Sequence, residues 1–234
     1  MNNFQRDMQI NDLVTQWLDT YLYGPKGFKI SRTDDFSSQH EGSDVIVTTP
    51  DGNRLVIDEK SSTQYIAYDD KMALPTFAFE IGYLVNGRFK EGWAIREDKY
   101  RQTTHYLLSW IKAKQKKIAQ VDDILVMHSL LLSKAKIHEI IHHIYVSILS
   151  AHNIDINASD AAYQLYQIAQ SCDKNNRMFW KNDFVYNGET YKYKLFYTDK
   201  SYIPEHPLNI LLYRKGDGQI LRKIADKEFL TEVK

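Results

Sequence analysis

The sequence lacks the features that mark secreted, membrane-spanning and disulfide-stabilised proteins. It has one cysteine, Cys172, so no disulfide can form within the chain, which fits a reducing compartment. Its most apolar helical run, IIHHIYVSIL, is too short and too rich in histidine to span a bilayer. The first residues, MNNFQRDMQIND, lack the basic-then-apolar pattern of a signal peptide. We therefore expect a soluble, cytoplasmic protein that does not associate with membranes.

Net charge is also missing, because 30 basic residues balance 30 acidic ones. The chain therefore has no overall basic field that would attract nucleic acid, although a local groove can be basic on a neutral protein. The sequence contains no G-x-x-x-x-G-K-[ST] loop, no G-x-G-x-x-G turn and no cysteine-based metal site. These absences argue against the common nucleotide-binding classes.

Proline and glycine are few and scattered, and no repeat or linker is visible in the 234 residues. Helical spacing of apolar residues predicts a helix within residues 3–23, stopped by Gly24-Pro25. Short apolar or alternating runs then predict strands. These runs are FKISR, DVIVTT, RLVIDEK, TFAFEIGYLV, GWAI, HYLLSWI and ILVMHSL.

Two helices are expected next. The first lies within residues 133–151 and carries a stripe of isoleucines. The second covers about 158–172, with Asn157 or Ser159 as its cap and Cys172 buried beside it.

The last third predicts a hairpin that turns at Asn187-Gly188, then a strand in PLNILLYR and a short final helix. The fold class expected is α/β (α+β), with a mixed central sheet flanked by helices. We expect residues 1–130 to form its main α/β part. Residues 131–234 would add a helical and hairpin part packed into the same domain, with a C-terminal subdomain from about residue 130 as the alternative.

The most informative segment is EGSDVIVTTPDGNRLVIDEKSS, which predicts a hairpin of two core strands. A loop of residues 50–52, with Gly52 in the left-handed position, keeps proline out of the strand ladder. Thr49 then pairs with Asn53. Counting back along both strands places Asp44 opposite Asp58.

Two carboxylates that face each other on a sheet repel, and partial burial strengthens the repulsion. Side chains alternate along a strand, so Asp58 and Lys60 share one face while Glu59 points to the other. A divalent cation between Asp44 and Asp58 would turn the repulsion into attraction. The alternative is that Lys60 simply neutralises one aspartate near a solvated strand end.

Asp44, the short hairpin and Asp58-Glu59-Lys60 resemble the PD-(D/E)xK nuclease superfamily, over roughly residues 3–62. The resemblance implies an αβββαβ core and hydrolysis of DNA phosphodiester bonds. It further implies that Asp44 and Asp58 bind Mg²⁺ or Mn²⁺, with the Glu59 backbone carbonyl as another ligand. Lys60 would orient or activate the attacking water.

The sequence departs from the family pattern in two places. Ser43-Asp44 stands where Pro-Asp is usual, and the first helix offers only aspartates where many members have another acid. We choose Asp12 as that accessory acid. Gln39 and Glu80 are further accessory candidates, although we favour an ordinary solvated loop for Gln39 and a salt bridge for Glu80. The densest basic run is the candidate for phosphate contacts, through Lys112, Lys114, Lys116 and Lys117.

A second metal motif competes with this interpretation. His138-Glu139-Ile140-Ile141-His142 matches the H-E-x-x-H pattern of zinc peptidases, in which the two histidines bind Zn²⁺ and the glutamate acts as base. Both histidines lie beside the isoleucine stripe, which also suits a surface cluster. A third interpretation is a catalytically inactive nucleic-acid-binding protein. The sequence leaves a homodimer open.

Overall fold

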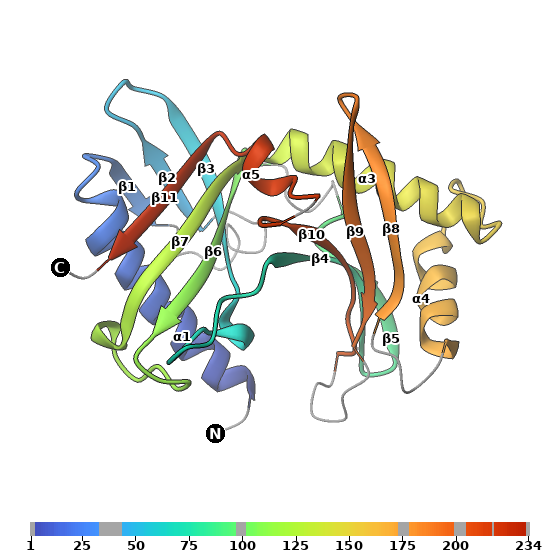
Figure 1. Cartoon of the computed structure of the whole chain (residues 1–234), viewed down its shortest axis with the longest axis horizontal. Helices are drawn as coiled ribbons and strands as arrows, with labels where there is room; N and C mark the ends of the chain where they lie inside the picture. Colours follow the sequence, from blue (N-terminus) through green and yellow to red (C-terminus); the bar gives the residue numbers. More distant parts are fainter. Residues whose placement is uncertain are drawn as a thin grey trace. The chain divides into compact units, whose positions relative to one another are not determined.

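The computed structural model describes residues 3–32, 44–96, 102–172, 178–198, 205–216 and 218–232, with side chains from residue 9 onward and, in the strand that starts at 178, from residue 181. The chain divides into two compact units. The first consists of Met1–Leu74, Arg101–Lys134 and Ile224–Lys234, and the second of Pro75–Tyr100 and Ala135–Lys223. Both combine helices with a β-sheet, so the expected α+β class is confirmed (Figure 1).

The first unit is built on a six-stranded mixed sheet in the order β1-β2-β3-β6-β7-β11. Its strands are β1 (Lys29–Arg32), β2 (Val45–Thr48), β3 (Arg54–Ser61), β6 (His105–Ala113), β7 (Ile124–Ser133) and β11 (Lys227–Glu232). β3 and β6 run parallel and the other neighbours antiparallel. The short 3-10 turn η3 (Val121–Asp123) joins β6 to β7.

One face of this sheet is covered by the first helix. α1 (Asn3–Trp17) continues directly into a π-helical turn, η1 (Leu18–Tyr23), and the chain leaves the helix at Gly24 as expected. The apolar side of α1 packs on the sheet in one hydrophobic core (Figure 1). That core includes Ile10, Val14, Trp17, Val45, Val47, Ile57, Leu107 and Ile111.

The connection between the parallel strands β3 and β6 departs from an αβββαβ order. A helix would stand in this crossover, but its described part, 62–96 and 102–104, contains no α-helix. It contains the 3-10 turn η2 (Thr63–Tyr65) and then β4 (Thr76–Val85) and β5 (Arg88–Glu91) of the second unit.

The second unit has an antiparallel sheet in the order β5-β4-β10-β9-β8 and two main helices. Its other elements are β8 (Met178–Tyr186), β9 (Glu189–Tyr197), β10 (Leu208–Tyr213), α3 (Lys134–Ala151), α4 (Ala161–Ser171) and α5 (Leu221–Ile224). The isoleucines of α3 are buried, as the stripe predicted. Asn187 and Gly188 both have positive φ, which confirms the expected tight turn between β8 and β9.

Several local predictions are wrong. GWAI is not a strand: β5 ends at Glu91, and Gly92 lies so close to β4 that an added Cβ would be 2.2 Å from the Glu80 carbonyl oxygen. The chain therefore turns there. Asp160, rather than Asn157 or Ser159, is the N-cap of α4.

Two further differences lie at element ends. Cys172 is exposed, because α4 ends at Ser171 and the cysteine follows it as the C-cap. β11 follows α5 and pairs with β7, although no strand was expected after the last helix. Within the described residues, no helix has the length and apolar character needed to cross a membrane.

Candidate active site

The β2–β3 hairpin brings Asp44 and Asp58 together as the sequence predicted. The N–H of Thr49 donates to the Asn53 carbonyl at 2.9 Å, and Val45 pairs with Ile57. The expected register is therefore confirmed. One residue further from the turn, the N–H of Asp44 donates to the Ile57 carbonyl at 3.1 Å.

The side chain of Asp44 also forms a hydrogen bond with the backbone of β3. Its Oδ2 accepts the backbone N–H of Glu59 at 2.7 Å. β2 begins only at Val45, so the Asp44 side chain takes a bond that the backbone of a longer β2 would otherwise make. The Asp44 carboxylate is thereby held at the edge of β3 beside Asp58.

Asp58 is a buried carboxylate with one satisfied oxygen. The residue is 1% exposed, and its Oδ1 lies 2.7 Å from the Nζ of Lys60 on the same strand face. Its Oδ2 is buried and has no hydrogen-bond partner within the described part of the chain. Such an oxygen is costly unless a donor or cation faces it.

The surroundings of Asp58 disfavour the ionised form of its carboxyl group. Burial raises the pKa of Asp58 to about 7, Lys60 opposes this rise, and the neighbouring Asp44 adds to it. Lys60 therefore offsets the effect of burial on the Asp58 carboxyl only in part. The Lys60 side chain is 28% exposed, so its ammonium joins the buried acid to a position that solvent can reach.

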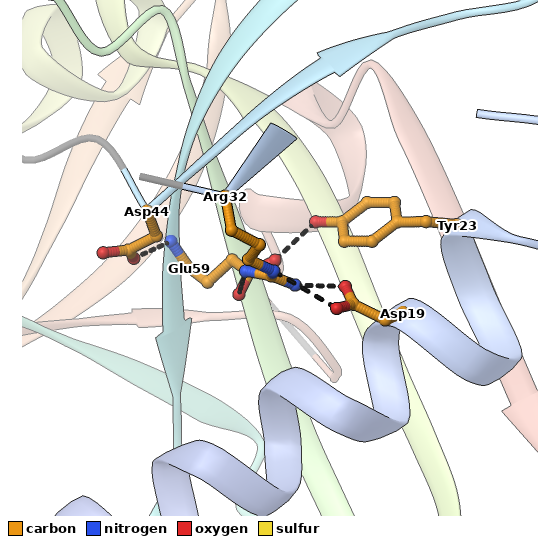
Figure 2. A network of polar contacts seen from close by, with 5 residues as sticks. All are labelled: Asp19, Tyr23, Arg32, Asp44 and Glu59. Carbon is orange, nitrogen blue, oxygen red and sulfur yellow. Dashed lines mark hydrogen bonds and ion pairs between the residues drawn. The ribbon is translucent and has the colours of Figure 1, made fainter. Parts of the chain in front are cut away.

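Glu59 points to the opposite face of β3, as the alternation predicted, and enters a polar network there (Figure 2). Its Oε1 accepts a hydrogen bond from the Tyr23 hydroxyl at 2.7 Å, and its Oε2 one from Arg32 Nη1 at 2.8 Å. Arg32 also donates to both carboxylate oxygens of Asp19. Burial raises the pKa of Glu59, while Arg32 and Tyr23 counteract the rise.

Tyr23 and Arg32 were not among the candidates from the sequence, and Asp19 was one of the helical aspartates that we passed over in favour of Asp12. Asp19 and Tyr23 stand four residues apart at the end of the first helix, which hints at a shared face. Arg32 pairs with Val45, but twelve residues separate the two in sequence. With a connection of that length, no turn rule sets the register of β1 against β2.

The accessory candidates are placed less favourably. The Asp12 side chain is exposed on α1, and Asp19 is the helical acid that joins the network. Gln39 lies outside the described residues. Glu80 lies on β4, which pairs with β5 and β10 in the other sheet, so strand pairing does not bring it beside Asp58.

The lysine candidates are Lys112, Lys114, Lys116 and Lys117, and all four are exposed at the far end of β6 or just after it. Asp58 pairs with Tyr106, six positions before the first of these lysines. At the rise of an extended strand this separation is roughly 20 Å. The lysines can therefore contact nucleic acid only at a distance from the carboxylates.

The competing histidine motif lies in the second unit. His138 and His142 line a cavity of about 150 Å³ together with Glu91 and Tyr145. Glu139, which would be the base of a peptidase, is exposed and does not line this cavity. Among the described residues, no cluster of three or more His, Cys, Asp or Glu side chains is arranged to hold a metal ion. Asp44 and Asp58 supply two carboxylates, one fewer than such a cluster contains.

Comparisons with known proteins do not assign the chain to a family. No model of a known protein family matches the sequence. Searches of characterised proteins and of solved structures likewise return no significant match.

Proposed function

We propose that this protein is a divalent-metal-dependent nuclease that hydrolyses DNA phosphodiester bonds at the site of Asp44, Asp58 and Lys60. The observation that supports this most strongly is the buried Oδ2 of Asp58, which lies beside a second carboxylate and accepts no hydrogen bond from a donor in the described part of the chain. In the proposed function Mg²⁺ or Mn²⁺ faces that oxygen. The resemblance of the Asp44 hairpin and the Asp58-x-Lys60 triplet to PD-(D/E)xK nucleases points the same way.

The donor set suits these ions. Carboxylate and carbonyl oxygens are the ligands that hard divalent ions prefer. Asp44, Asp58 and the Glu59 carbonyl would hold the ion, because the N–H and C=O of one extended residue point to the same edge of a strand. When bound, the ion supplies Lewis-acid polarisation of the phosphodiester.

Lys60 has a separate task in this proposal. When both carboxyls are ionised, Asp44, Asp58 and Lys60 together carry one negative charge, which would repel a phosphodiester. A divalent ion reverses that sign. Once the ion neutralises Asp58, the Lys60 ammonium can orient the attacking water or donate to a phosphate oxygen, where charge develops in the reaction.

The test is cleavage of DNA by the full chain in Mg²⁺, compared between Asp58→Asn and Asp122→Asn. Asp122 is an exposed acid, so its variant matches the change in charge away from the site. We expect Asp58→Asn to reduce the rate by at least about 100-fold. The matched variant should cleave as the wild type does. Unchanged cleavage by Asp58→Asn would end the proposal.

The same purified protein distinguishes the nuclease from the two alternative functions, a zinc peptidase and an inactive nucleic-acid-binding protein. His138 and His142 of the H-E-x-x-H motif line one cavity, so a zinc site there is the second candidate. Zinc that copurifies with the chain and is lost in His142→Ala, together with peptide cleavage, would favour a zinc peptidase. DNA binding without cleavage in any divalent ion would favour an inactive nucleic-acid-binding protein.

A further inference from the structure

Glu59 joins two polar systems on opposite faces of β3. Its backbone N–H is bound by the Asp44 carboxylate, and its side chain is bound by Tyr23 and Arg32 (Figure 2). The side chain is only 7% exposed, and both carboxylate oxygens have a donor. These three hydrogen bonds fix the backbone of Glu59 at the point where Asp44 meets β3.

Arg32 reaches Glu59 across a whole strand. It ends β1, pairs with Val45 of β2, and bonds to a residue of β3. Two interstrand spacings amount to roughly 10 Å, so the extended arginine ties the three strands together beside Asp44. Two other guanidinium nitrogens of Arg32, Nε and Nη2, contact the Asp19 carboxylate. The position of the arginine therefore does not depend on Glu59 alone.

The helical end of the network has an unusual local structure. Asp19 and Tyr23 both belong to the π-helical turn η1, which the N–H of Gly24 closes on the Asp19 carbonyl at 3.1 Å. π-turns are rare and occur frequently at functional sites. The wider turn directs both side chains toward Arg32 and Glu59 (Figure 2).

The free energy of folding alone does not explain well why the Arg32–Glu59 ion pair occupies this place in the core. Glu59 follows Ile57 on the face that α1 covers, where an apolar residue would join the core. Replacing a buried ion pair by apolar residues is often neutral or stabilising, and in some proteins such polar groups are retained because they specify one conformation. The polar pair is therefore better explained by positioning than by folding free energy.

We infer that Glu59 is a positioning residue, held by Arg32 and Tyr23, which places the Asp44 carboxylate and the Glu59 carbonyl for binding a divalent cation. Arg32, Tyr23 and Asp19 then set the affinity of the site for the cation without touching it. This inference rests on the proposed function. Residues that orient metal ligands from outside typically change metal affinity by about 10- to 100-fold.

The test measures Mn²⁺ binding to the full chain by electron paramagnetic resonance, and the Mg²⁺ concentration that gives half-maximal DNA cleavage. The variants are Arg32→Met and the milder Tyr23→Phe. Thr231→Val is the matched control, because it removes a buried hydrogen bond of 3.0 Å from Trp17 in the same unit, away from the hairpin. Denaturant unfolding confirms that each variant is folded.

We expect Arg32→Met to weaken Mn²⁺ binding by at least about tenfold and Tyr23→Phe by a smaller factor. Cleavage at saturating Mg²⁺ should return close to the wild-type rate, and Thr231→Val should bind Mn²⁺ normally. If Asp58→Asn no longer binds Mn²⁺ but Arg32→Met and Tyr23→Phe bind it as the control does, the positioning inference is overturned and the proposed function is not. If the wild type binds no Mn²⁺, or Asp58→Asn binds it equally well, the proposed function falls together with the inference.

Discussion

Asp44 accepts the backbone N–H of Glu59 at 2.7 Å, so one acid of the hairpin is fixed by the backbone of the residue that follows the other. The position of the Asp44 carboxylate therefore depends on the backbone of Glu59. Asp58 differs, because its Oδ2 has no partner among the described residues. The charge state of Asp58 should consequently respond to pH and to added cations.

The first prediction concerns stability and pH in the absence of divalent ions. The pKa of Asp58 is raised to about 7 in the folded protein, from an ordinary value of 3.8. Its contribution to the free energy of unfolding is complete below the ordinary pKa and is lost as the pH rises through about 7, on the order of a few kcal/mol. Asp58→Asn cannot ionise, so it should lose less stability than the wild type between pH 5 and pH 8.

Urea unfolding at these two pH values measures the effect. Asp122→Asn provides the control, since it removes an exposed acid and should follow the wild type. Parallel pH dependence of wild type and Asp58→Asn would show that burial does not raise the pKa of Asp58.

The second prediction concerns stabilisation by the cation. A ligand that binds only the folded state at about 100 times its Kd adds about 2.7 kcal/mol to the free energy of unfolding. Mn²⁺ should therefore raise the melting temperature of the wild type. It should raise that of Asp44→Asn or Asp58→Asn much less, because each variant loses a charged ligand. Equal shifts in all three proteins, measured by thermal unfolding, would place the bound ion elsewhere.

The third prediction separates binding from chemistry. In Lys60→Met, Asp58 loses its ammonium partner at 2.7 Å, so the need for a cation increases. We expect Mn²⁺ affinity to be retained or increased while DNA cleavage falls by about 100-fold or more. Lys29→Met, at an exposed position of β1, is the matched variant. A normal cleavage rate in Lys60→Met would remove the lysine from the proposed mechanism.

The fourth prediction concerns the basic run after β6. Glutamine at Lys112, Lys114, Lys116 and Lys117 should weaken DNA binding and flatten its dependence on salt, because each phosphate contact contributes a slope of about 0.9. Cleavage of saturating DNA should change little, since the run lies roughly 20 Å along the sheet from Asp58. The double variant K90Q/K181Q, at exposed positions of the second unit, controls for general charge. An identical salt slope would remove the run from the binding surface.

The hairpin was predictable because its information is local. Residues 50–52 define the turn, the turn defines the register, and side-chain alternation then places Asp58 and Lys60 on one face and Glu59 on the other. The tight turn at Asn187-Gly188 followed from the same chemistry. A second Asn-Gly turn, Asn86-Gly87, also has positive φ at both residues and leads directly into β5. The strand that pairs with β4 is therefore β5, and GWAI is not that strand.

By itself, the sequence determined the α+β class, most of the elements and the approach of Asp44 to Asp58, because periodicity and turn chemistry act over a few residues. Tertiary structure decided which residues hold Glu59, since Arg32 and Tyr23 reach it from 27 and 36 positions away. It also decided the interleaving of the two units, in which residues 75–100 belong with 135–223. The contacts of Glu59 and the division into units depend on strand order and on long-range packing, which arise only when distant segments of the chain come together.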